Sequence, residues 1–177
     1  IDEAIRLVQL GQSPWRDSSD LNLDLGKDTF FASLTFDKLE DALPHLKDLE
    51  KDVDALEVRA DLLKDQSEFG ISHALSTLRR KMDKKSRASI GGIVFTVRSS
   101  DQCGAFELEE RGGVKKMYDL LKVGLRCGVE TLDVEWGHGD REYHKLLKYT
   151  RNRYPSTATL GSYHAVGHYI EMDRKAP

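Results

Sequence analysis

Residues that could do chemistry recur at similar places in five apolar stretches of this sequence. They comprise hydroxyl, carboxylate, guanidinium and imidazole side chains: Ser33, Glu57, Arg59, Asp61, Arg98, Asp133, Glu135 and His164. Charged groups inside apolar strands are costly unless they are paired. Their recurrence therefore indicates one convergent site. In such a site, guanidinium groups bind carboxylate and hydroxyl oxygens, and a histidine moves protons near neutral pH.

Each of these residues also has a structural interpretation. Glu57 and Arg59 alternate along one stretch and would share a face, where they could form only an ion pair. Asp133 and Glu135 could pair with Arg98 or lie at helix N-termini, and His164 could be a surface residue. The remaining histidines fall in predicted loops or helices and are interpreted as surface residues: His45, His73, His138, His144 and His168.

The elements that would position these side chains alternate in type. Five stretches have the composition of buried strands: 29–35, 55–59, 92–98, 130–136 and 157–163, the last interrupted by Gly161. Four stretches between them place apolar residues at helical spacing: 37–50, 68–82, 113–127 and 140–151. This alternation predicts a parallel sheet with helical crossovers.

A doubly wound sheet and an eight-stranded barrel both contain this alternation. No glycine-rich phosphate loop follows the first predicted strand, which disfavours the nucleotide-binding sheet. Barrel enzymes carry their active sites at the carboxyl ends of the strands. The polar residues fall at these ends, which favours the barrel.

The composition is that of a folded domain. The chain has 177 residues, 39% of them hydrophobic, which is about one domain in length. Its formal charge of −3 gives no electrostatic footprint for nucleic acid or an anionic membrane, and no apolar run reaches the roughly 20 residues of a membrane span. The two cysteines, Cys103 and Cys127, suggest a reducing compartment and show no metal-type spacing.

Three successive motifs resemble those of the type I 3-dehydroquinate dehydratases of the shikimate pathway. They are Glu57-x-Arg59-x-Asp61, Phe95-Thr96-x-Arg98 and Ser162-x-His164. The resemblance extends from about residue 29 to residue 168. The eukaryotic multidomain versions look most similar, judging by the stretches 33–36, 54–63 and 94–98.

The resemblance implies a fold and a reaction. The fold is an α/β, (β/α)8 TIM barrel, of which this chain would hold about the first five βα units. The reaction converts 3-dehydroquinate to 3-dehydroshikimate and water through an imine between a lysine and the substrate ketone, with no metal or organic cofactor. The protonated imine is an electron sink that acidifies the neighbouring C–H bond.

The resemblance also assigns roles to five residues. His164 is expected to be the general base and then the general acid. Glu57 is expected to orient His164 and to favour its charged form. The substrate is expected to contact Ser33, Glu57, Arg59 and Arg98.

The chain departs from the family pattern in three places. Ala165 stands where an acidic residue often follows the histidine, and Cys103-Gly104 stands where a Gly-Gly pair usually follows the third strand. The imine-forming lysine is expected on a sixth strand, whereas the sequence ends at Pro177; Lys175 comes too soon to match it. Residues 1–27 have a mixed pattern that Gly11 and Pro14 interrupt, and we expect them to be a linker or pre-barrel segment. We expect residues 28–177 to be a barrel portion truncated before strand six, inactive alone.

Two other functions are open on the sequence alone. One is an inactive fragment or interaction remnant. The other is a metal-dependent barrel enzyme with Glu57, Asp133, Glu135 and His164 as ligands. The resemblance further implies other shikimate-pathway domains in the same polypeptide and leaves a dimer open. It predicts a cytoplasmic location, or a plastid one in a photosynthetic eukaryote.

Overall fold

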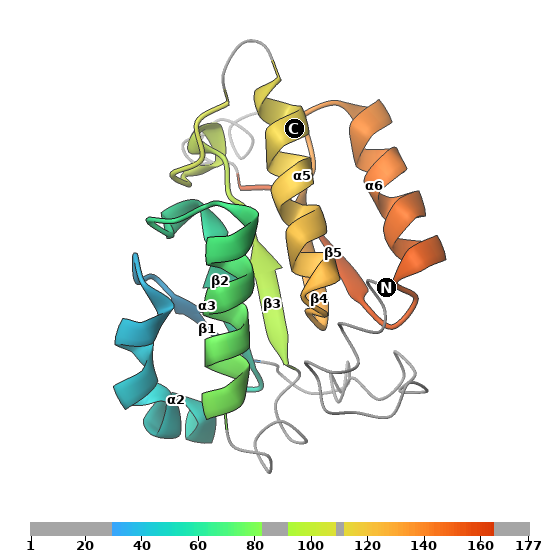
Figure 1. Ribbon diagram of the computed structural model, residues 1–177. Helices are drawn as coiled ribbons and strands as arrows, with labels where there is room; N and C mark the ends of the chain where they lie inside the picture. The colour runs from blue at the N-terminus through green and yellow to red at the C-terminus, as the bar shows by residue number, and fades with distance from the viewer. Residues whose placement is uncertain (1–29, 83–91, 109–111, 165–177) are drawn as a thin grey trace, which may run out of the picture.

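Five strands form one parallel sheet in the order β1-β2-β3-β4-β5. The computed structural model describes residues 30–82, 92–108 and 112–164 (Figure 1). The strands are β1 (Phe31–Leu34), β2 (Ala55–Arg59), β3 (Ile93–Thr96), β4 (Thr131–Glu135) and β5 (Ala158–Ser162). All five predicted strands are confirmed, each within its predicted range. The predicted segment 1–27, together with Ala165, His168 and Lys175, lies outside the described residues.

The helices lie between the strands in the predicted places. They are α2 (Leu46–Asp52), α3 (Glu68–Lys81), α5 (Gly113–Arg126) and α6 (Asp140–Arg153), with short 3-10 helices η2 (Leu39–His45), η3 (Ala60–Leu62) and η4 (Ser100–Gln102). The prediction of one continuous helix over 37–50 is wrong. Its first half is the 3-10 helix η2, which contains Pro44. Proline has no backbone N–H and its ring clashes with the preceding turn of an α-helix, so an α-helix through this position is disfavoured.

Sequential strand order distinguishes the two folds that the alternation allowed. A nucleotide-binding doubly wound sheet changes direction after its first strands, so that consecutive strands are not all neighbours. Here every strand pairs in parallel with the strand that follows it in the chain. This is the order of the first five βα units of a (β/α)8 barrel.

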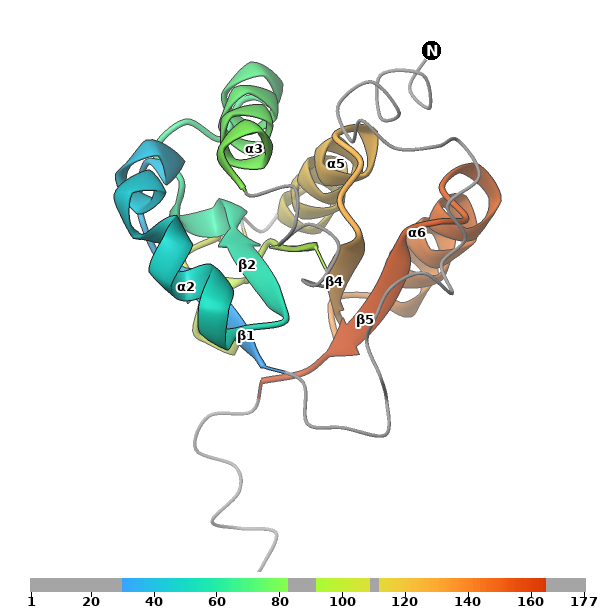
Figure 2. The ribbon, with the colours of Figure 1, turned by 90° about the horizontal axis from the view of Figure 1, so that it is seen from below.

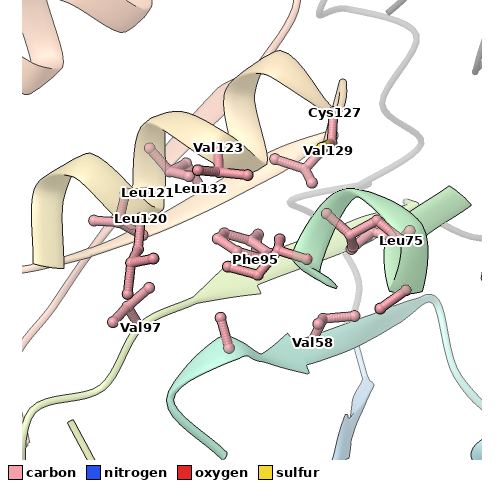
Figure 3. Packing of buried hydrophobic residues seen from close by; sticks show 14 of the residues in the cluster. Val58, Leu75, Phe95, Val97, Leu120, Leu121, Val123, Cys127, Val129 and Leu132 are labelled. Atoms are coloured by element: carbon pink, nitrogen blue, oxygen red, sulfur yellow. The ribbon is translucent and has the colours of Figure 1, made fainter. Parts of the chain in front are cut away.

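The hydrophobic core lies between the sheet and its helices. All four α-helices cover one side of the curved sheet, as Figure 2 shows. Val58, Phe95 and Leu132 of the strands pack there with Leu75 of α3 and Leu121 of α5 (Figure 3), and all five are fully buried. Burying such a side chain contributes roughly 1.5–3 kcal/mol. This helix-covered face anchors the strands.

The opposite face of the sheet, here called the inner face, is polar at its centre and open at its edges. Side chains alternate along a strand, so Glu57 and Arg59 point away from the core that Leu56 and Val58 enter. At the edge strands, Phe31 of β1 and Leu160 of β5 are 51% and 46% exposed. Two edge strands with exposed apolar side chains fit a barrel wall that is not closed within the described residues.

The described helices are too short or too polar to cross a membrane.

Candidate active site

Three buried carboxylates meet on the inner face at the carboxyl end of the sheet. Glu57 lies on β2, and Asp133 and Glu135 lie on β4. Each residue is at most 3% exposed. Parallel pairing brings them together because β3 lies between these strands and contributes Thr96 and the following Arg98.

Hydroxyl groups fix the Glu57 carboxylate. Ser33 Oγ donates to Glu57 Oε2 from β1. Thr96 Oγ1 donates to Glu57 Oε1 over 2.7 Å from β3 and lies 3.4 Å from Asp133 Oδ2. Glu57 is therefore held from both neighbouring strands, and the register that pairs Ser33 with Glu57 accounts for the first contact.

The Arg98 guanidinium lies among all three carboxylates without a close contact to any. Its Nη2 atom is 3.5 Å from Glu57 Oε1 and 3.5 Å from Asp133 Oδ2, and its Nε atom is 3.7 Å from Glu135 Oε1. The Nε atom is buried and has no hydrogen-bond partner among the described residues. These distances are longer than a normal hydrogen bond. Arg98 therefore supplies charge to the cluster while its N–H groups keep the capacity to donate to a ligand.

Arg59 pairs with Asp61, and this corrects the simplest structural interpretation of the Glu57–Arg59 alternation. Arg59 Nε and Nη2 donate to the two Asp61 carboxylate oxygens at 2.9 and 2.7 Å, and this pairing raises the pKa of Arg59. Asp61 also accepts from the backbone N–H groups of Arg98 and Ala105 at 3.2 and 3.0 Å. Asp61 thus orients Arg59 and fixes the loop after β3.

Burial dominates the ionisation of Asp133. It raises the pKa of this carboxyl group, while neighbouring Ser162 and Arg98 oppose the rise. Ser162 Oγ and Asp133 Oδ1 nevertheless make no hydrogen bond of normal geometry among the described residues. Asp133 is consequently a carboxylate that the fold makes harder to ionise.

His164 follows β5 at the same end of the sheet. Its Nε2 atom is buried and has no hydrogen-bond partner among the described residues. A positive charge on this ring would lower the pKa of the Asp133 carboxyl. Glu57 contacts Ser33, Thr96 and Arg98, and this Nε2 atom is not one of its partners. The predicted orientation of His164 by Glu57 stays a prediction.

His138 was interpreted as a surface residue, and this is wrong. Its side chain is only 5% exposed, with Nε2 3.1 Å from each of Glu135 Oε2, Ser99 Oγ and Gln102 Nε2. Its Nδ1 atom lies 3.7 Å from Asp101 Oδ2. The loop after β4 folds back over the sheet end, which no spacing in the sequence indicated.

The other histidines in the described part follow the prediction. His45, His73 and His144 are exposed, and His168 lies outside the described residues.

A cation site among these carboxylates is disfavoured by the position of Arg98. The alternative function required Glu57, Asp133, Glu135 and His164 as metal ligands. Residues 30–82, 92–108 and 112–164 contain no cluster of His, Cys, Asp or Glu arranged for this purpose. The guanidinium instead stands where a cation would have to approach Glu57 and Asp133, and like charges repel.

Comparison with known proteins places the chain in a family. The model of the type I 3-dehydroquinase family matches residues 30–174. The chain belongs to the type I 3-dehydroquinase family. The pentafunctional AROM polypeptide of Schizosaccharomyces japonicus is 37% identical over 117 residues, which cover 62% of this chain and 7% of that polypeptide. The Candida glabrata AROM polypeptide is 34% identical over 134 residues, covering 76% of this chain and 8% of that polypeptide.

Solved structures of this type show the same fold. The dehydroquinate dehydratase and shikimate dehydrogenase from S. pombe AroM matches with a TM-score of 0.67 at 26% identity, covering 84% of this chain and 26% of that chain. The Enterococcus faecalis 3-dehydroquinate dehydratase matches with a TM-score of 0.67 at 14% identity, over 83% and 58% of the two chains. The chain therefore spans a small part of its multidomain relatives, and its fold is a partial TIM barrel.

The loop after β3 contains Cys103-Gly104, at the place where the resemblance implies two glycines. Cys103 has a φ of 65°, in the left-handed region that glycine adopts most readily. A Cβ on Gly104 would come within 2.0 Å of the Arg98 carbonyl oxygen, so only glycine fits this position. The sequence departs from the pattern at the position that tolerates a side chain, at some conformational cost.

Proposed function

We propose that this chain supplies the proton-transfer and substrate-binding half of a 3-dehydroquinate dehydratase. The family membership gives the reaction class. The observation that carries the assignment is the unpartnered, buried Nε2 atom of His164 at the sheet end that also holds Arg98 and the three carboxylates. A buried ring nitrogen without a partner is a proton acceptor available to a ligand in that space.

Each residue then has a task in the reaction. His164 removes the proton next to the imine carbon and returns a proton to the departing hydroxyl group, which leaves as water. Arg98 donates to the hydroxyl and carboxylate oxygens of 3-dehydroquinate through the N–H groups that its carboxylate neighbours leave free. Glu57 and Ser33 line the site beside Arg98, and the ion pair with Asp61 fixes the orientation of Arg59.

The amine of the imine comes from a lysine, as the resemblance implies. None of the five described strands contains a lysine. The proposal therefore assigns it to a sixth strand of the barrel, and the 177 residues alone are expected to leave 3-dehydroquinate undehydrated. The multidomain relatives favour neighbouring shikimate-pathway domains in the same polypeptide.

The test uses the complete polypeptide that contains this sequence. With 3-dehydroquinate and borohydride, it should acquire a covalent label, because borohydride reduces the imine to a stable amine. His164→Ala should still be labelled while turnover falls roughly 10²–10⁴-fold, the usual contribution of general acid–base catalysis.

His144→Ala is the matched control, because His144 is an exposed histidine on α6. It should turn over like the unaltered protein. Equal turnover of the His164 and His144 variants would refute the assignment of His164. Absence of both labelling and turnover in the unaltered protein would refute the reaction itself.

A further inference from the structure

The ladder between β4 and β5 has an unusual ending next to His164. Paired residues run from Thr131 with Ala158 to Glu135 with Ser162, and Trp136 N then donates to Ser162 O over 2.8 Å. In a parallel ladder a residue that donates in this way accepts next from the N–H two residues further along the partner strand. The expected next bond is therefore from His164 N to Trp136 O.

A side chain occupies the place of that bond. Gln102 Nε2 donates to Trp136 O over 2.8 Å, and His164 N donates to Gln102 Oε1 over 2.9 Å. The amide of Gln102 thus stands between the two backbone groups and satisfies both. Its orientation is determined by its partners, because a carbonyl oxygen can only accept and a backbone N–H can only donate.

We infer that Gln102 is a positioning residue whose inserted side-chain amide separates the ends of β4 and β5 and sets where His164 lies. The inserted amide is as wide as a peptide group, so it holds His164 away from the position that a direct bond to Trp136 O would give it. The position of the His164 ring is then controlled from η4, on the loop after β3, and not by the strand that precedes it.

The surroundings hold Gln102 in place. Its side chain is buried, with the residue only 3% exposed. His138 Nε2 lies 3.1 Å from Gln102 Nε2 and 3.1 Å from Glu135 Oε2. This ring nitrogen accepts from Gln102 when it carries no proton and donates to Glu135 when it does. Glu135 in turn accepts from Ser99 N and Ser99 Oγ, which ties η4 to β4.

The catalytic consequence rests on the proposed function, because it requires His164 to be the general base. Misplacement of a reacting group by about 1 Å can lower a rate by about 10²-fold. Gln102 does not need to touch the substrate to have such an effect. It should influence proton removal and leave imine formation, which depends on a different residue, unchanged.

Two measurements on the complete polypeptide test the inference. Gln102→Met keeps the length of the side chain and removes the hydrogen bonds to Trp136 O and His164 N, together with the contact to His138 Nε2. The backbone amide of His164 should then exchange with deuterium at least about tenfold faster, the equivalent of roughly 1.4 kcal/mol. The turnover number should fall roughly 10- to 100-fold with borohydride labelling retained.

Gln102→Glu and Ser100→Ala are the comparison variants. Gln102→Glu keeps an acceptor for His164 N and loses the donor to Trp136 O, so exchange at His164 should lie between the unaltered protein and Gln102→Met. It also provides the test should Gln102→Met fold poorly. Ser100→Ala alters an exposed residue of the same 3-10 turn and should change neither quantity.

Unchanged protection of His164 in both Gln102 variants would overturn the inference. Equal loss of labelling and turnover would also overturn it, because that pattern indicates general structural damage. If the unaltered polypeptide shows no dehydration at all, the proposed function fails, and the exchange measurement still decides whether the inserted amide positions His164.

Discussion

Two arginines lie at opposite ends of this sheet and are bound in different ways: Arg79 is buried and Arg98 is half-buried. Arg79 of α3 lies at the amino end, where Nη1 and Nη2 donate to the Glu130 carboxylate at 2.8 and 3.0 Å. Its Nη2 atom also donates to the Gly128 carbonyl oxygen at 2.5 Å. Arg98 at the carboxyl end lies 3.5–3.7 Å from its three carboxylate neighbours. Each arginine has a buried Nε atom without a partner in the described part of the chain.

The difference distinguishes a structural ion pair, formed by Arg79, from a candidate ligand-binding group, Arg98. Glu130 also accepts from the backbone N–H of Ile93 at 2.8 Å, so the Arg79 pair joins α3, the start of β3 and the start of β4 with little donor capacity left over. Arg98 has carboxylate neighbours on both adjacent strands, β2 and β4, but retains N–H groups that could donate to a ligand. In barrel enzymes the amino end serves stability and the carboxyl end carries catalysis, and the substrate-binding role proposed for Arg98 accords with that division.

The largest effect on stability is expected from breaking the Arg79–Glu130 ion pair. Arg79→Met leaves Glu130 without its bidentate partner, and removal of one member of a buried pair costs about 3–5 kcal/mol of unfolding free energy. The measurement is urea unfolding at constant protein concentration. Arg80→Met, an exposed change on the same helix, should stay within about 0.5 kcal/mol of the unaltered protein. Similar values for the two variants would show that the Arg79 pair is not structural.

A smaller effect on stability is expected at Arg98. Glu57 and Glu135 keep other hydrogen-bond donors when Arg98 is replaced by Met, so the unfolding free energy should fall by only about 1 kcal/mol. Binding of 3-dehydroquinate by the complete polypeptide should weaken at least about tenfold, because charged hydrogen bonds are lost. Calorimetric titration measures the second quantity. A stability loss as large as that of Arg79→Met, with unchanged binding, would reverse the comparison.

The pH dependence of stability tests the cost of burying Asp133. Burial raises the pKa of this carboxyl above its unfolded value, so the folded state binds the proton more tightly. Its contribution to stability is fully present below the unfolded pKa and is lost as the pH rises through the folded pKa. Asp133→Asn should therefore raise the urea midpoint near neutral pH and leave it unchanged well below the pKa of an ordinary aspartate. A lower midpoint near neutral pH would contradict this.

The smallest effect is expected in the loop after β3. Cys103→Gly removes the left-handed strain of a non-glycine residue, although glycine also increases the entropy of the unfolded chain. The expected net gain is about 0.5–1 kcal/mol in urea unfolding. Ser100→Ala, an exposed change in the same loop, is the control and should leave the unfolding free energy unchanged. The other cysteine, Cys127, is buried and is therefore not suitable as a control. Destabilisation by Cys103→Gly would mean that the thiol makes a contact worth more than the strain.

Much of the fold was predictable because it depends on local patterns. The β-branched runs and helical spacings predicted five strands and four helices, and the alternation predicted parallel pairing. The helix over 37–50 was mispredicted because leucine spacing does not distinguish an α-helix from a 3-10 helix, and Pro44 decided between them. Gly161 looked like an interruption of β5, yet it lies within the strand, where a Cβ would come 2.9 Å from the Tyr143 hydroxyl, so glycine leaves room for the end of that side chain.

The candidate site was predictable only as a set of residues. Recurrence of polar groups at strand ends identified Glu57, Arg98, Asp133 and Glu135, and parallel strands must bring such ends together. The pairing of Arg59 with Asp61, the open contacts of Arg98 and the burial of His138 depend on side-chain directions and on loops that cross the sheet end. The clearest case is Gln102, whose amide replaces a backbone bond beside His164. The sequence alone determined which strand residues meet at the sheet end, because strand periodicity is local. Only the tertiary structure decided how they are held, because those contacts depend on side-chain directions and on loops that bring residues of different strands together.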